Sequence, residues 1–115
     1  MGVVGVSTSG WNEDNLDTSA TKTILSIGSN QAFKVTEIII TNSDTANPAV
    51  VEFFDEAAST SPNTDNRKIP AIRVGAGETT RIEFKDGPVF TTAVSARATS
   101  GTVNARDCMV NGIMF

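Results

Sequence analysis

From Thr21 onward the chain is built of short apolar runs separated by turn residues, with a spacing of about ten residues. Apolar and polar side chains alternate within these runs. In the run that begins at Phe33, for example, apolar Phe33 and Val35 alternate with polar residues. No stretch carries the apolar stripe of an amphipathic helix. The alternation therefore predicts an all-β fold in which a strand has a core face and a solvent face.

The runs are numerous enough to close an antiparallel β-sandwich of about seven or eight strands. They cover residues 21–27, 33–41, 49–54, 67–74, 78–84, 89–98 and 102–115. The continuous Ile38-Ile39-Ile40 indicates that the second run is a central strand covered on both faces. Pro70 has no backbone N–H group, which places the fourth run at a sheet edge or a bulge.

The same pattern predicts the core and the connections between strands. Turns are expected at residues 28–30, 75–77 and 86–88, and the polar stretch 55–66 is expected to be an exposed, mobile loop. The expected core is a single cluster on the apolar faces of the strands. Its members are Ile38, Ile40, Val51, Phe53, Ile82, Phe84, Val94 and Ala96.

The first twenty residues have a different character from the rest of the chain. They are mostly Gly, Ser, Thr, Asn and Asp, and Trp11 and Leu16 are the only large apolar residues after Val6. Such a segment forms either an arm or an irregular cover strand, and we expect residues 1–20 to be an extended N-terminal arm, followed by one domain at 21–115. Trp11 either packs over an open end of the sandwich or anchors the arm in a neighbouring subunit. We expect the arm to bind a partner through Trp11, with Leu16 as a second anchor.

The composition argues against several classes of function. The chain has 13 acidic and 9 basic residues and a net charge of -4, so its field repels nucleic acid. It has no His and no Tyr, which removes His-based catalytic triads and His-ligated metal sites. No run approaches the roughly 18 apolar residues of a membrane span. Cys108 has no partner for an internal disulfide, so stability comes from burial or from association.

Three local patterns could carry chemistry, and each has a simpler interpretation. The segment 75–79 is glycine-rich like a phosphate loop, but it lacks the lysine and the following helix, so we predict a hairpin turn. The acidic clusters at 55–65 and 13–17 lack the spacing of a calcium loop and are interpreted as solvated charge. Cys108 is expected to be a buried thiol. We therefore expect no enzyme, no catalytic residue, no metal and no cofactor.

The order of elements resembles that of small phage capsid cement or decoration proteins with a jelly-roll-like sandwich. The resemblance covers about four fifths of the chain as a pattern of strands and turns. It is carried by the runs at 33–42 and 50–54, the turn at 74–79, the Gly87-Pro88-Val89 approach to Val94, and the strand at 101–103. It implies a virion protein, made in the host cytoplasm, that forms a homotrimer and binds major capsid proteins on the outside of the shell.

Two other functions are compatible with the same sequence. The chain is either another structural part of a virion, at the neck or tail, or a sandwich module that binds a carbohydrate or host receptor. A receptor-binding module would use exposed aromatic residues or acidic loops at one end of the sandwich. An enzyme ranks third, because no nucleophile with its base is recognisable.

Overall fold

The computed structural model describes residues 6–13, 16, 20–99 and 106–115, and nearly all of the regular structure is β. A single 3-10 turn, η1 (Thr64–Asn66), lies in the loop after the fourth strand. The strands are β1 (Val6–Glu13), β2 (Lys22–Ser26), β3 (Phe33–Asn42), β4 (Ala49–Phe54), β5 (Arg67–Val74), β6 (Thr79–Glu83), β7 (Val89–Phe90), β8 (Ala93–Thr99) and β9 (Arg106–Met114). The expected extended runs are thus confirmed over the described residues, and the sixth is divided into β7 and β8. Residues 101–105, which include the start of the last expected run, lie outside the described residues.

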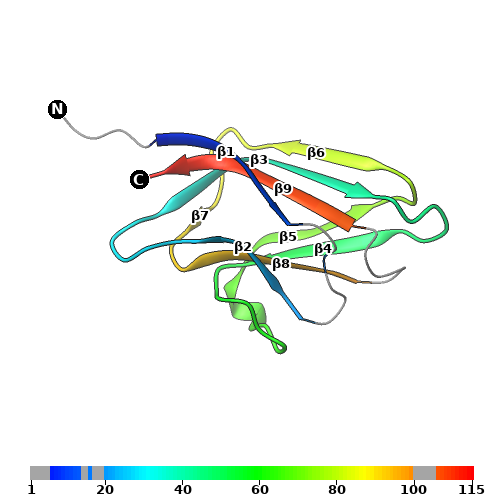
Figure 1. Ribbon diagram of the computed structural model, residues 1–115, viewed down its shortest axis with the longest axis horizontal. Coiled ribbons are helices and arrows are strands. Elements are labelled where there is room, and N and C mark those ends of the chain that lie inside the picture. The colour runs from blue at the N-terminus through cyan, green and yellow to red at the C-terminus, as the bar shows by residue number, and fades with distance from the viewer. Residues whose placement is uncertain (1–5, 14–15, 17–19, 100–105) are drawn as a thin grey trace.

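The strands form two antiparallel sheets that face each other (Figure 1). One, the β3 sheet, has the order β1-β9-β3-β6, and β7 also pairs with β3. The other, the β4 sheet, has the order β2-β8-β4-β5. Because β1 pairs with β9, β2 with β8, β3 with β6 and β4 with β5, the chain is one long hairpin rolled over on itself. Apart from the short β7, this is the strand order of a jelly roll, as expected.

β3 is the central strand that its apolar sequence predicts. It pairs with β9 on one side and with β6 and β7 on the other. Residues opposite each other in an antiparallel pair share a face, so Ile38 lies beside Val110 and Ile40 beside Cys108 on the core side. Ile39 lies on the outer face and is only half-buried. The outer face of β3 is therefore not fully covered, in contrast to the expectation from the three isoleucines.

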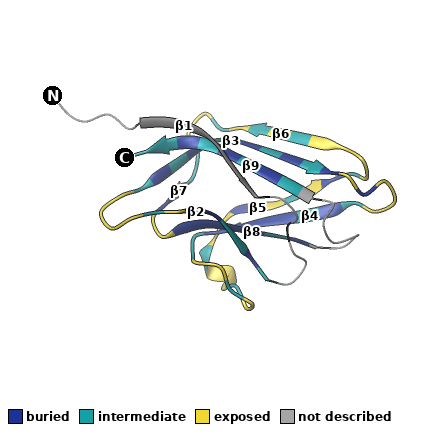
Figure 2. Cartoon of the chain, viewed as in Figure 1, coloured by how far each residue is buried: buried dark blue, intermediate teal, exposed yellow. Residues whose placement is uncertain are grey.

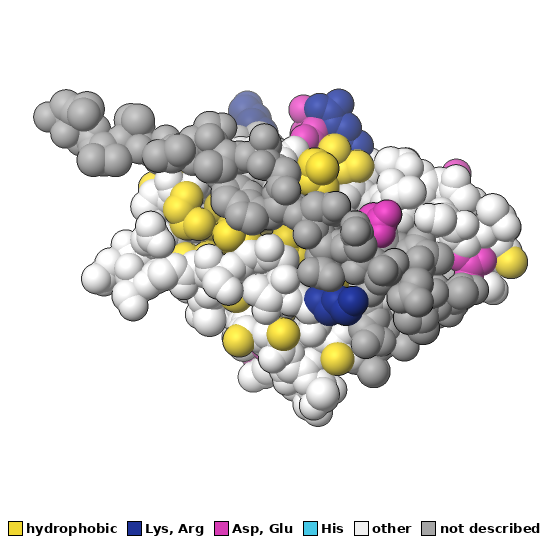
Figure 3. Space-filling view, viewed as in Figure 1, with side chains coloured by type: hydrophobic (Ala, Val, Ile, Leu, Met, Phe, Trp, Pro, Cys, Tyr) yellow, Lys and Arg dark blue, Asp and Glu magenta, His cyan; other side chains and the backbone are white. Residues whose placement is uncertain are grey.

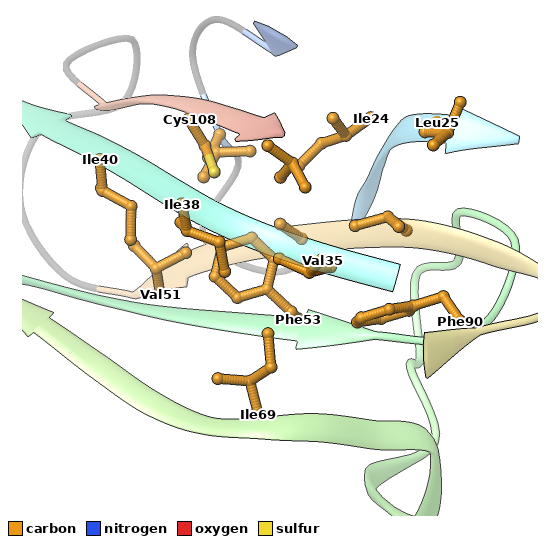
Figure 4. Close-up of a cluster of buried hydrophobic side chains, with 14 of the residues drawn as sticks. Ile24, Leu25, Val35, Ile38, Ile40, Val51, Phe53, Ile69, Phe90 and Cys108 are labelled. Atoms are coloured by element: carbon orange, nitrogen blue, oxygen red, sulfur yellow. The ribbon is translucent and has the colours of Figure 1, made fainter. Parts of the chain in front are cut away.

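The core lies between the two sheets, whose strands carry most of the buried residues (Figure 2). Side chains from β3 point there toward those of β4 (Figure 4). Burial confirms most of the predicted core: Ile38, Ile40, Val51, Phe53, Val94 and Ala96 are all buried. Ile82 and Phe84 are only half-buried, which differs from the prediction. Ile82 lies on β6 and Phe84 follows it directly, at one outer edge of the β3 sheet, where no further strand pairs among the described residues.

The N-terminal segment differs from the expected separate arm. β1 pairs with β9 of the same chain, for example Val6 with Met114 and Asn12 with Met109. Leu16 is fully buried in the core cluster between the sheets. Backbone hydrogen bonds to β9 thus hold a strand whose own side chains are mostly polar. At least these parts of residues 1–20 belong to the sandwich.

The turn between β5 and β6 is fixed by a buried amide. Asn42, at the end of β3, donates from Nδ2 to the carbonyl oxygens of Asn47 at 2.9 Å and Gly75 at 3.3 Å. Gly77 adopts a φ of 69°, which favours glycine, and its N–H donates to the carbonyl of Asp44 at 2.9 Å. These contacts set the position at which β6 begins.

Candidate interaction surface

The most distinctive charged feature of the fold is β5, the outer strand of the β4 sheet. Among the described residues, β5 pairs with β4 alone. Arg67, Lys68 and Arg73 are exposed on it, and the strand contains no acidic residue. Arg73 lies opposite Val50 of β4, and Arg67 lies opposite Phe54. The strand thus carries a concentration of positive charge in a chain whose net charge is -4.

A carboxylate on the neighbouring strand orders part of this charge. The side chain of Glu52 is only 10% exposed and lies between two guanidinium groups. It accepts from Nη1 of Arg67 at 2.6 Å and from Nε of Arg97 at 2.9 Å. Arg97 also lies over the ring of Phe54, 5.4 Å from its centroid, in cation–π geometry. One negative charge shared by two arginines leaves this cluster positive.

Lys68 and Arg73 complete the positive surface of β5. Within the part of the chain that the structure describes, neither forms an ion pair with an acidic side chain. Both are exposed. An unpaired exposed cation steers acidic partners and sets their orientation. Together with Arg67 and Arg97 they form what we call the β5 basic surface, which therefore fits an acidic partner.

The backbone of β5 is poorly suited to strand addition. Pro70 removes one N–H group, and the register with β4 shifts twice, between Val51 and Phe53 and between Phe53 and Phe54. Proline, bulges and positive charge are all features that keep an edge strand from pairing with another strand. A partner of the β5 basic surface would therefore be contacted through side chains.

Two of the three acidic residues of the loop 55–66, Asp55 and Glu56, order the loop through hydrogen bonds. Oδ1 of Asp55 accepts from the N–H of Thr92 at 2.8 Å, at the start of β8. Oε1 of Glu56 accepts from the N–H of Asn63 at 2.9 Å and from Nδ2 of Asn66 at 3.2 Å. These bonds tie the loop to itself and to β8. The second acidic cluster, at 13–17, lies outside the residues whose side chains the structure describes.

A second polar cluster lies on the outer face of the β3 sheet. Glu37 of β3 accepts from Arg81 of β6 and, at 2.6 Å, from Nδ2 of Asn111 of β9. The hydrogen bond from Arg81, followed by that from Asn111, lowers the pKa of Glu37 below its ordinary value. This carboxylate thus holds three neighbouring strands together on a face open to water.

The two residues predicted to bind a partner are not brought together at a surface. Leu16 lies in the core, so it is not available as an exposed anchor. The backbone of Trp11 pairs with Val110, and its side chain lies outside the described part of the chain. Sequence reasoning missed the β5 basic surface. The sequence feature that indicates this surface is the run 67–74 around Pro70, which contains three basic residues and no acidic residue.

The other candidate positions are structural. Cys108 is buried in β9, and burial raises the pKa of its thiol, as expected for an inert cysteine. The segment 75–79 is a turn that leads into β6. Over the described residues, the surface holds no pocket and no helix is long and apolar enough to cross a membrane. Comparison with protein-family models, curated proteins and solved structures found no match to the chain.

Proposed function

We propose that the protein is a structural component of a phage particle, a cement protein that binds the outside of the shell and stabilises neighbouring major capsid proteins. The eight-stranded jelly-roll order supports this proposal, since viral capsid domains use this architecture. The same architecture also occurs in lectin domains, so the fold does not select the function by itself.

The β5 basic surface is the observation that carries the proposal. It carries four cations and one buried carboxylate in an acidic protein: Glu52 holds Arg67 and Arg97 in place, and Lys68 and Arg73 form no ion pair with a described acidic side chain. A charged surface whose edge strand is poorly suited to pairing with another strand favours docking, through side chains, onto an already folded, acidic surface. We infer that this partner is a major capsid protein or another protein of the same particle.

Co-sedimentation with shells of the virus that encodes the protein tests this function. The wild-type protein is expected to sediment with the shells, and binding should weaken as salt is raised. Lys68→Glu and Arg73→Glu should each weaken binding by roughly tenfold, because each places like charges at the contact. Lys85→Glu is the matched control, since Lys85 is an exposed cation beyond β6 that pairs with no described acidic group.

The outcomes separate the proposal from its alternatives. Binding of the wild-type protein that survives both charge reversals would contradict the role of β5 while leaving the location on the shell intact. Absence of the protein from shells, together with its presence in purified necks or tails, would place it elsewhere in the particle. Retention on immobilised host glycans without shell binding would favour the receptor-binding function.

A further inference from the structure

β6 is an edge strand of a different kind from β5. It is the outer strand of the β3 sheet (Figure 1). Its register with β3 is continuous from Glu37↔Glu83 to Thr41↔Thr79, with no shift. The pairings that hold the other outer strands, β1, β2 and β5, each contain a shift. β6 also lacks Pro and Gly. It therefore lacks the proline and the register shift that disfavour pairing along β5.

The hydrogen bonds to β3 show which backbone groups of β6 point outward. Asn42 donates to the carbonyl of Glu78 at 2.9 Å, and Phe84 donates to the carbonyl of Thr36 at 2.9 Å. In an antiparallel pair, alternate residues of a strand bond to the same neighbour. The even-numbered residues of β6 therefore bond to β3. Thr79, Arg81 and Glu83 direct their N–H and C=O groups toward the open edge.

The same odd-numbered residues carry opposite charges on the outer face. The side chain of Arg81 is 60% exposed and that of Glu83 is 71% exposed. Figure 3 shows basic and acidic side chains next to each other at the end of β6. On the core side of the strand, Ile82 is half-buried. The edge thus combines free backbone groups, an apolar residue and one charge of each sign.

We propose that β6 pairs antiparallel with β6 of a second copy of this chain, around a two-fold axis at Ile82. In this register Arg81 of each copy lies opposite Glu83 of the other, and both residues have the outward backbone groups that hydrogen-bonded pairs require. A shift to the next allowed register places Arg81 opposite Arg81, or Glu83 opposite Glu83. Among the two-fold registers that pair residues within β6, only the one at Ile82 places opposite charges against each other.

A two-fold contact with a second copy fits this edge better than a head-to-tail contact does. A two-fold contact uses the same surface on both copies, so a strand with one cation and one anion two residues apart is complementary to itself. The pairing would join the two β3 sheets into one and remove the half-exposed Ile82 from water. β5 is not complementary to itself in this way, because it carries three cations and no acidic residue. The inference does not depend on binding to a viral shell.

Sedimentation equilibrium and native mass spectrometry on the full chain at micromolar concentration test the proposal. The wild-type protein is expected to have the mass of two chains. Glu83→Arg and Arg81→Glu should each weaken the dimer by roughly tenfold or more, since each creates two like-charge pairs. A mixture of the two variants should restore a dimer, because each strand then meets its complement. Asp65→Lys, at an exposed position of the loop after β4, is the control and should leave the mass unchanged.

The folded state of each variant is checked by its thermal transition, because Arg81→Glu also removes the bond to Glu37. If that variant does not fold, Glu83→Pro replaces it, since the N–H of Glu83 points to the open edge and β3 does not use it. Glu83→Pro should then abolish the dimer. A monomeric or trimeric wild-type protein, a dimer that survives the β6 variants, or a mixture that stays monomeric would each overturn the proposal.

Discussion

Replacing Phe53 with alanine is expected to lower the free energy of unfolding by about 3–5 kcal/mol. Phe53 lies on β4, is fully buried, and points from the β4 sheet into the shared core (Figure 4). Its removal takes away apolar contacts with both sheets and leaves a cavity that the surrounding strands cannot fill completely. Urea denaturation of both proteins, at one protein concentration, measures the difference.

Phe84→Ala is the matched comparison, because it deletes the same atoms at the margin of the core. Phe84 packs against the core cluster but is only half-buried. Its replacement is expected to cost about half as much, on the order of 1–2 kcal/mol. A larger loss for Phe84 than for Phe53 would contradict the position of the core between the two sheets.

Leu16→Ala is expected to destabilise the protein by about 2–5 kcal/mol. Leu16 is fully buried in the core cluster although it lies in a polar segment. The arm hypothesis leads to the opposite result, namely an unchanged thermal transition. Calorimetry separates the two, because a loss of this size shifts the melting temperature by several degrees.

Val89→Ala provides the control for Leu16. Val89 is an apolar residue of β7 with 39% exposure, so its truncation should change stability by less than about 1 kcal/mol. If Leu16→Ala were as mild as Val89→Ala, Leu16 would not be part of the core, and residues 1–20 would be free to act as an arm.

Local alternation was sufficient to predict most strands and the central position of β3. The pattern works there because the core faces are apolar, as in Ile38 and Ile40 on β3 and Val51 and Phe53 on β4. The bounds and the partner of β1 were not predicted, because Ser, Thr and Gly give it no apolar face. It is held by backbone pairing with β9, about a hundred residues away in sequence, and such long-range pairing leaves no local signal.

The interaction surface was less predictable than the fold. The basic residues of β5 are visible in the sequence, but Glu52, Arg67 and Arg97 meet only because β4 lies between β5 and β8. That Lys68 and Arg73 have no acidic partner among the described residues likewise follows from the fold, which determines which carboxylates lie near them. The outward direction of the Arg81 and Glu83 backbone groups follows from the register with β3, which a single sequence does not reveal.

The central claim, that this jelly roll cements a viral shell, is tested most directly by calorimetry of shells with and without bound protein. The proposal predicts that shells saturated with the wild-type protein come apart at a higher temperature than bare shells. With the Lys68→Glu, Arg73→Glu double variant, the shells should come apart at the same temperature as bare shells. Shells that carry the wild-type protein at full occupancy and melt at the temperature of bare shells would contradict the claim.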